Sequence, residues 1–217
     1  MDFMKRLFIF GAAALLFGCA ESADLFNKDL SNAECKKPVW SFGEDGALGS
    51  TVDEILWTKD DYENFELELE YKVTPEGNGG IIVYSTNTDN WIPDSIEVQI
   101  GDYDYWLEKF GPNGTDGAIF GFQGVKKRFS KPLGEWNTLR MVCRGTSIKV
   151  YINGELANDF DMTKFTDSKK NPDGTVPFKW LQNTPRSEVA TKGRIGFQGH
   201  HGKGDAFYRN LKIKKLD

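Results

Sequence analysis

The 217-residue sequence contains only three cysteines and two histidines. No spacing among them resembles a zinc site, so we predict no bound metal and no cofactor, with a divalent cation left open as an alternative. Basic clusters are also scarce, and the strongest is Lys126-Lys127-Arg128. With a net charge of -5 and a pI near 5.2, the chain is not expected to bind nucleic acid.

Long hydrophobic runs are missing except at the N-terminus, where Leu7 to Phe17 follow Lys5 and Arg6. This run is too short for a permanent membrane span. Leu16 to Cys19 resembles a bacterial lipobox, which predicts a signal peptide at 1–18, a lipid on Cys19 and a tether at 19–24. An ordinary secretory signal is the alternative.

The lipobox predicts a lipid anchor, and we expect the protein in the cell envelope, at the periplasmic or outer-membrane face of a Gram-negative bacterium. The only membrane contact would be the lipid. Removing residues 1–18 changes the net charge from -5 to -6, because Asp2, Lys5 and Arg6 are lost. Cys35 and Cys143 would remain. Cys143 alternates in phase with Leu139 and Met141, which favours a core position, and a disulfide in an oxidising compartment is the alternative.

Residues 25–217 lack a convincing amphipathic helix and an internal repeat, and their pattern predicts one all-β domain. Phe65 to Val73 alternates five apolar with four charged residues, as a half-buried strand does. Asn153-Gly154 is a type I′ hairpin signal. Phe207, Leu211 and Ile213 are predicted to share a face of the last strand. We predict an antiparallel β-sandwich or jelly roll, with long loops at 101–116 and 161–193.

Two predicted strands carry hydrogen-bonding groups on the face opposite the core. In the first, Ile96, Val98 and Ile100 alternate with Glu97 and Gln99. In the second, Ile195 and Phe197 alternate with Gln198 and His200. If both strands belong to one sheet, Glu97, Gln99, Gln198 and His200 lie on one face and form a site for a polar ligand such as a saccharide.

The order and spacing of several short motifs resemble the 3-keto-disaccharide hydrolase domain, a concanavalin A-like sandwich of the lectin/glucanase type that is frequent in Bacteroidetes lipoproteins. The resemblance covers nearly all of residues 25–217. The matching segments are Leu25 to Leu30, Gly77 to Ile81, Glu97 to Ile100, Gly117 to Gly121, Gly134 to Thr138, Tyr151 to Gly154 and Ile195 to Gln198, with His200, Arg209 and Asn210.

The resemblance implies a glycoside that a partner sugar 3-dehydrogenase has oxidised at C3. A C3 ketone acidifies the C2 proton, so a base can remove it and the enolate can expel the group at C1, after which water adds. Such a site needs a base, an acid and donors for the enolate oxygen. Glu97 and His200 are the candidate base and acid. The candidate substrate-binding residues are Asn78, Tyr84, Gln99, Trp106 and Gln198.

Each candidate also has a structural alternative. His200 could cap a turn, Glu97 could pair with a lysine across the sheet, and Asn78 could serve a turn. Arg209 is read first as a structural ion-pairing residue. Tyr84 and Phe120 stand where the family often has Arg and Tyr. The alternative functions are therefore a non-catalytic carbohydrate-binding lipoprotein and an assembly lipoprotein that binds protein.

Overall fold

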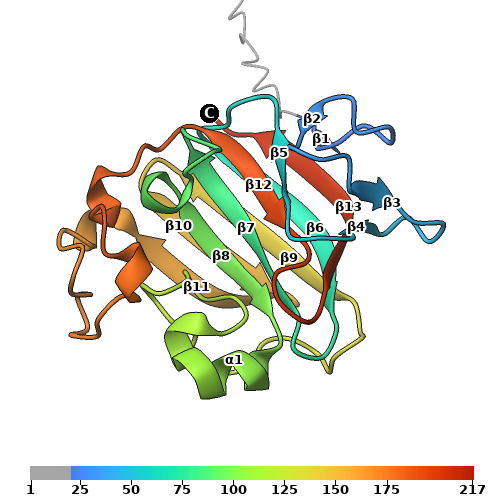
Figure 1. Ribbon diagram of the computed structural model, residues 1–217. Coiled ribbons are helices and arrows are strands. Elements are labelled where there is room, and N and C mark those ends of the chain that lie inside the picture. The colour runs from blue at the N-terminus through green and yellow to red at the C-terminus, as the bar shows by residue number, and fades with distance from the viewer. Residues whose placement is uncertain (1–20) are drawn as a thin grey trace, which may run out of the picture.

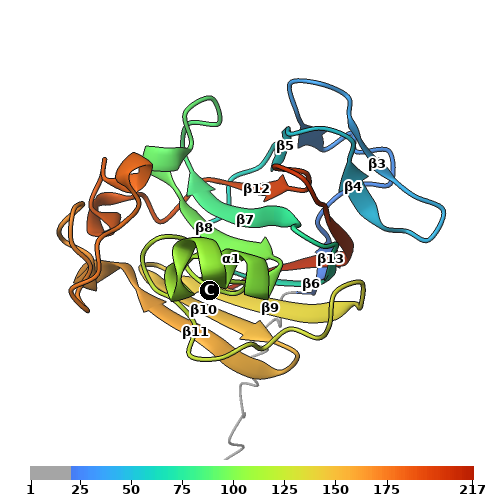
Figure 2. The same cartoon turned by 60° about the horizontal axis from the view of Figure 1, so that its bottom comes forward.

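The computed structural model describes residues 21–217, so the predictions for the signal peptide at 1–18 and for lipidation at Cys19 lie outside the described residues. Two antiparallel sheets pack face to face (Figure 1), and Figure 2 shows the layers edge on, with α1 (Tyr103–Phe110) at one end of the sandwich. No helix in residues 21–217 is long and apolar enough to cross a membrane.

The larger sheet has eight strands, seven of them in the order β11-β10-β9-β6-β13-β4-β3, with β1 paired to β13. Its strands are β1 (Ala23–Asp24), β3 (Trp40–Phe42), β4 (Leu48–Ser50), β6 (Phe65–Val73), β9 (Asn137–Arg144), β10 (Ser147–Ile152), β11 (Glu155–Asp161) and β13 (Ala206–Lys215). Because β1 pairs with β13, ordered pairing begins inside the predicted tether.

The smaller sheet has the order β2-β5-β12-β7-β8. Its strands are β2 (Ala33–Glu34), β5 (Ile55–Thr58), β7 (Asn78–Ser85), β8 (Ile96–Gly101) and β12 (Arg194–Gln198). Short 3-10 turns lie in the connecting segments, at Ile92–Asp94, Pro112–Gly114, Met162–Lys164, Lys179–Leu181 and Arg186–Glu188.

The core lies between the sheets and follows the predicted alternation. In β6, Leu67, Leu69 and Tyr71 are buried, while Glu66 on the other face pairs with Arg140 at 2.7 Å. Ile96, Val98, Ile195 and Phe197 are also buried, as predicted. Burying such apolar faces is the main driving force for folding.

Several finer predictions are confirmed. Asn153 and Gly154 have φ values of 51° and 82°, which a type I′ hairpin requires. Cys35 and Cys143 are both free, and Cys143 is buried in β9. Arg209 makes a bidentate ion pair with Glu70, at 3.0 and 3.1 Å.

The prediction that the 101–116 loop contains no helix is wrong, because α1 lies within it. The Asp102 side chain accepts a hydrogen bond from the Tyr105 N–H at the start of α1, and the helix ends at Gly111, which has a φ of 67°.

The prediction of which β13 side chains face the core is also wrong at Phe207. Asn210 has a φ of 54°, and the register between β6 and β13 shifts between Arg209 and Lys212. This bulge exchanges the two faces of β13. The side chains that belong to the core are therefore Tyr208, Leu211 and Ile213, and Phe207 lies outside it.

Candidate functional site

The floor of the candidate site is a row of polar residues across three neighbouring strands. Gln99 of β8 pairs with Gly80 of β7, and Gly80 pairs with Gln198 of β12. Strands in a sheet are about 4.8 Å apart, so the two glutamine backbones lie roughly 10 Å from each other. Gly80 has no side chain, so the space above it is available to a side chain from a neighbouring strand.

Glu97 occupies the space that Gly80 leaves free. A Cβ atom at position 80 would lie 2.3 Å from Oε1 of Glu97. The cross-strand partner of Glu97 on β7 is Ile82, and within residues 21–217 the Glu97 carboxylate has no hydrogen bond or ion pair. The alternative that Glu97 pairs with a lysine across the sheet is therefore wrong.

Desolvation by the surrounding apolar side chains raises the pKa of Glu97 to about 8, from an ordinary value of 4.5. Cavity solvent still reaches part of the side chain. A carboxyl group poised near neutral pH in a cleft is typical of catalytic acids and bases.

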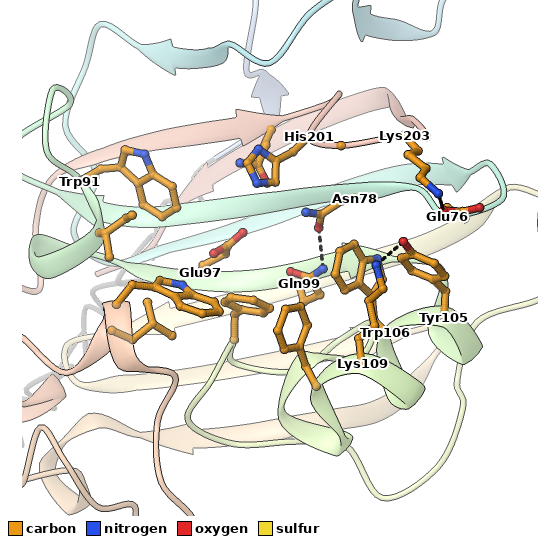
Figure 3. Close-up of a pocket in the computed structure, with 17 residues that line it drawn as sticks. Glu76, Asn78, Trp91, Glu97, Gln99, Tyr105, Trp106, Lys109, His201 and Lys203 are labelled. Carbon is orange, nitrogen blue, oxygen red and sulfur yellow. Dashed lines mark hydrogen bonds and ion pairs between the residues drawn. The ribbon is translucent and has the colours of Figure 1, made fainter.

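Asn78 and Gln99 form a fixed amide pair beside Glu97 (Figure 3). Nε2 of Gln99 donates to Oδ1 of Asn78 at 2.8 Å. The bond leaves Nδ2 of Asn78 as a donor toward the cavity. Asn78 is the first residue of β7, and its carbonyl oxygen accepts from the His201 N–H at 3.1 Å, so the β12–β13 connection is held against the same strand.

Aromatic side chains from outside the small sheet form the walls of a cavity of about 510 Å³. Trp106 of α1 donates its Nε1–H to the Gly77 carbonyl at 2.8 Å and stacks on Phe110 at 5.4 Å. The cavity is lined by Glu76, Asn78, Trp91, Ile92, Glu97, Gln99, Tyr105, Trp106, Lys109, Phe110, Phe120, Trp180, Leu181, Gln198, His201, Gly202 and Lys203.

The histidine that lines this cavity is His201, not the predicted His200. β12 ends at Gln198, so the alternation that placed His200 beside Gln198 does not extend to it. Nδ1 of His200 lies 2.5 Å from Asp205 in an isolated bridge, which supports the structural alternative. Nδ1 of His201 lies 2.7 Å from Asp53, and this contact orients the ring.

The prediction that Tyr84 belongs to the site is also wrong. Tyr84 has a φ of 64°, and the β7–β12 register is irregular at this point. The bulge turns its ring into the core, where it is fully buried and its hydroxyl donates to the Gly145 carbonyl at 3.0 Å. Phe120, by contrast, lines the cavity and supplies no hydroxyl there.

The rim of the cavity near α1 is charged. Lys203 pairs with Glu76 at 2.9 Å, and the amino group of Lys109 contacts the Tyr105 hydroxyl. Figure 3 shows Lys203 and Glu76 beside the opening, with His201 on the β12–β13 side and Trp106 on the α1 side. Residues 21–217 contain no cluster of three or more potential metal ligands among His, Cys, Asp and Glu.

Five of the predicted site residues line one cavity, namely Asn78, Glu97, Gln99, Trp106 and Gln198. The walls formed by Trp91 and Trp180, and His201, were not predicted. The sequence did contain a signal for α1, because Asp102 and Gly111 are typical capping residues on either side of its eight residues. No local pattern indicates that Trp91 and Trp180 face the same cavity, because they come from separate loops.

Comparison with known proteins identifies the family of the chain. Residues 21–214 match the model of the 3-keto-alpha-glucoside-1,2-lyase-like domain. A 3-keto-disaccharide hydrolase of Bacteroides thetaiotaomicron is 29% identical over 204 residues, covering 84% of this chain and 68% of that protein. A crystal structure of a glycosyl hydrolase candidate from Parabacteroides distasonis is 44% identical, with a TM-score of 0.84, covering 90% of this chain and 100% of that one.

A Bacillus subtilis protein with a galectin-like fold is 12% identical, with a TM-score of 0.53, covering 91% of this chain and 96% of that one. At this identity the likeness shows the fold alone, and it confirms the predicted concanavalin-like sandwich. The family match extends over nearly the whole described structure. The chain belongs to the 3-keto-alpha-glucoside-1,2-lyase-like domain family.

Proposed function

We propose that this protein cleaves 3-keto-glycosides, with Glu97 as the base that removes the C2 proton. The observation that carries the proposal is the Glu97 carboxyl group, which lies over Gly80, has no partner among residues 21–217 and has a pKa raised to about 8. Amide groups of Asn78, Gln99 and Gln198 line the same cavity and suit sugar hydroxyls and an enolate oxygen.

The reaction balances without a cofactor. Glu97 takes the C2 proton, and the electron pair of the C–H bond moves toward the C3 carbonyl to give an enolate. The enolate then forms the C1–C2 double bond and expels the oxygen at C1, which takes a proton. Water adds at C1 while a proton returns to C2. The sum is one glycoside and one water converted to a 3-keto sugar and an alcohol.

The cavity residues supply the other two functions that the reaction needs, which are donors for the enolate oxygen and an acid for the leaving oxygen. Nδ2 of Asn78 and the Gln198 amide donate to the enolate oxygen. His201, oriented by Asp53, replaces the predicted His200 as the acid for the leaving oxygen. The three amides carry no charge in the working pH range, so they add no charge–charge interaction that would shift the pKa of Glu97. Burial in the cavity is then the main cause of its raised pKa.

The test is to incubate the protein with a 3-keto-glucoside and with the unoxidised glucoside in deuterated water. We expect release of the alcohol from the ketone alone, with deuterium at C2 of the product. Because the free site has a pKa near 8 at Glu97, kcat/KM is expected to rise with pH and to level off above pH 8. If Glu97 acted as an acid instead, kcat/KM would fall as the pH rises through its pKa.

Glu97→Gln is expected to lose on the order of 10² in rate or more, the scale of a positioned base. The matched control is Glu68→Gln, on the solvated face of β6, which should retain full activity. Full activity in Glu97→Gln would refute the assignment of the base.

The second candidate is a non-catalytic carbohydrate-binding protein. The observation that favours it is Phe120, which lines the cavity and supplies no hydroxyl for an enolate. Such a protein would retain an unoxidised saccharide on an affinity column and would leave the 3-keto-glycoside intact.

We also propose that Cys19 carries a lipid that holds the protein in the cell envelope, from the lipobox-like sequence Leu16 to Cys19. A sugar 3-dehydrogenase in the same compartment would supply the substrate. Cys19→Ser should give an uncleaved or soluble product. Unchanged processing and unchanged membrane partitioning would refute the lipid anchor.

A further inference from the structure

The cavity has two chemically different halves. Its polar half comes from β7, β8 and β12 and carries the amides and Glu97. Apart from the charged rim, its apolar half comes from the end of α1 and from the connecting segments at 91–92, 120 and 180–181. The side chains of the apolar half, called here the aromatic wall, are Trp91, Ile92, Phe110, Phe120, Trp180 and Leu181.

Most rings of the aromatic wall are packed against one another before any ligand binds. The ring centroid of Phe110 is 6.1 Å from that of Phe120 and 5.9 Å from that of Trp180. Phe178 supports all three, with centroids 4.8 Å from Phe110, 5.1 Å from Phe120 and 5.3 Å from Trp180. A ligand therefore meets a formed surface, and little side-chain ordering opposes its binding.

Trp180 is the exposed member of the wall. Its side chain is 49% exposed, although its ring stacks on Phe178 at an interplanar angle of 22°. Exposed tryptophan held in a fixed orientation beside a cavity is typical of a binding surface, because Trp is enriched at energetic hot spots.

The aromatic wall suits an apolar group better than a second sugar. Apart from the indole N–H groups of Trp91 and Trp180, its side chains have no hydrogen-bonding atom. Phe120 lines this half and supplies no hydroxyl to it. Sugar hydroxyls placed against the wall would lose hydrogen bonds to water without replacement, which costs free energy.

We propose that the preferred substrates are 3-keto-glycosides whose leaving group is a planar, apolar alcohol, which lies against the aromatic wall while the sugar lies over the polar floor. This proposal rests on the proposed function for the sugar half. The Phe120 N–H donates to the Glu97 carbonyl at 3.0 Å, so the base is near the apolar half, and in Figure 3 Trp91 and Glu97 lie on the same side of Asn78. The proposal places C2 of the sugar at Glu97 and C1, with its leaving group, on the side of the aromatic wall.

The test uses three 3-keto-glucosides, those of 2-naphthylmethanol, of methanol and of a second glucose. All three leaving groups are alcohols, so differences in binding report contacts rather than leaving-group acidity. Binding is measured by calorimetry and cleavage by product release. We expect the naphthylmethyl compound to bind at least about tenfold more tightly than the other two, the scale of burying an aromatic group among several rings.

Trp180→Ala should reduce the naphthylmethyl-to-methyl binding ratio by about fivefold or more. Val176→Ala is the matched control, because Val176 is exposed in the same segment and does not line the cavity. If the disaccharide binds as tightly as the naphthylmethyl compound, the aglycone proposal is refuted while the proposed cleavage stands. If no compound is cleaved, the proposed function fails, and the binding ratio still decides the aglycone proposal.

Discussion

Replacing Glu97 by glutamine is expected to stabilise the protein, and to do so only at high pH. The folded-state pKa of Glu97 is about 8, and the ordinary value in an unfolded chain is 4.5. Between these values the folded protein holds a proton that the unfolded chain releases. The free energy of unfolding of the wild type therefore falls as the pH rises through this window. Glutamine is neutral throughout and has no such dependence.

The size of the effect follows from the difference between the two pKa values. At about 1.4 kcal/mol per tenfold change in proton affinity, a pKa raised from 4.5 to about 8 corresponds to roughly 5 kcal/mol across the window. Because cavity solvent reaches part of the side chain, we expect about half of this, roughly 2–3 kcal/mol. The difference should be near zero at pH 4 and complete above pH 8.

The assay is urea unfolding of both proteins at several pH values between 4 and 9, with the same slope required for both. Asp116 is buried, and its pKa is raised to about 6, but it titrates alike in the two proteins and cancels. Glu68→Gln, on the solvated face, should show no such pH-dependent difference. A Glu97→Gln effect that is independent of pH, or that decreases as pH rises, would refute the desolvated site.

Three further predictions concern the site and the fold. Gly80→Ala would place a Cβ 2.3 Å from Oε1 of Glu97, so activity should fall at least tenfold while far-UV circular dichroism stays native; wild-type activity would show that Glu97 moves freely. His201→Ala should lose on the order of 10² in kcat with the 3-keto-glycoside and His200→Ala much less, and the reverse order would restore the original sequence prediction. Gly154→Ala should cost about 1 kcal/mol in urea unfolding, because Gly154 has a φ of 82°, and an unchanged midpoint would contradict the type I′ turn.

Alternation predicted the strands wherever the pleat is regular. Glu97 and Gln99 reach the cavity, and Ile96 and Val98 reach the core, because β8 has no bulge between them. The type I′ turn was readable because Asn-Gly is the pair that tolerates two positive φ values. These features are local, so one sequence is enough to specify them.

The errors on faces have one physical cause. A period-two pattern assumes that every residue continues the pleat, but Tyr84 and Asn210 have positive φ values and interrupt it. After each interruption the faces exchange, which places Tyr84 in the core and Phe207 outside it. The sequence gives no strong signal for a bulge at Tyr84, or at Asn210, which is followed by Leu211. His200 failed for a related reason, since β12 had already ended at Gln198.

The aromatic wall links the pKa of the base to the choice of leaving group. Burial raises the pKa of Glu97, and Trp91 and Phe120 of the aromatic wall line the same cavity as this carboxyl group. An apolar group bound there would exclude more water and would strengthen the interaction of Glu97 with a developing enolate charge and its amide donors. A second sugar would carry hydroxyls and water into the same space. We therefore expect the aromatic wall to influence both the choice of leaving group and the pKa of Glu97.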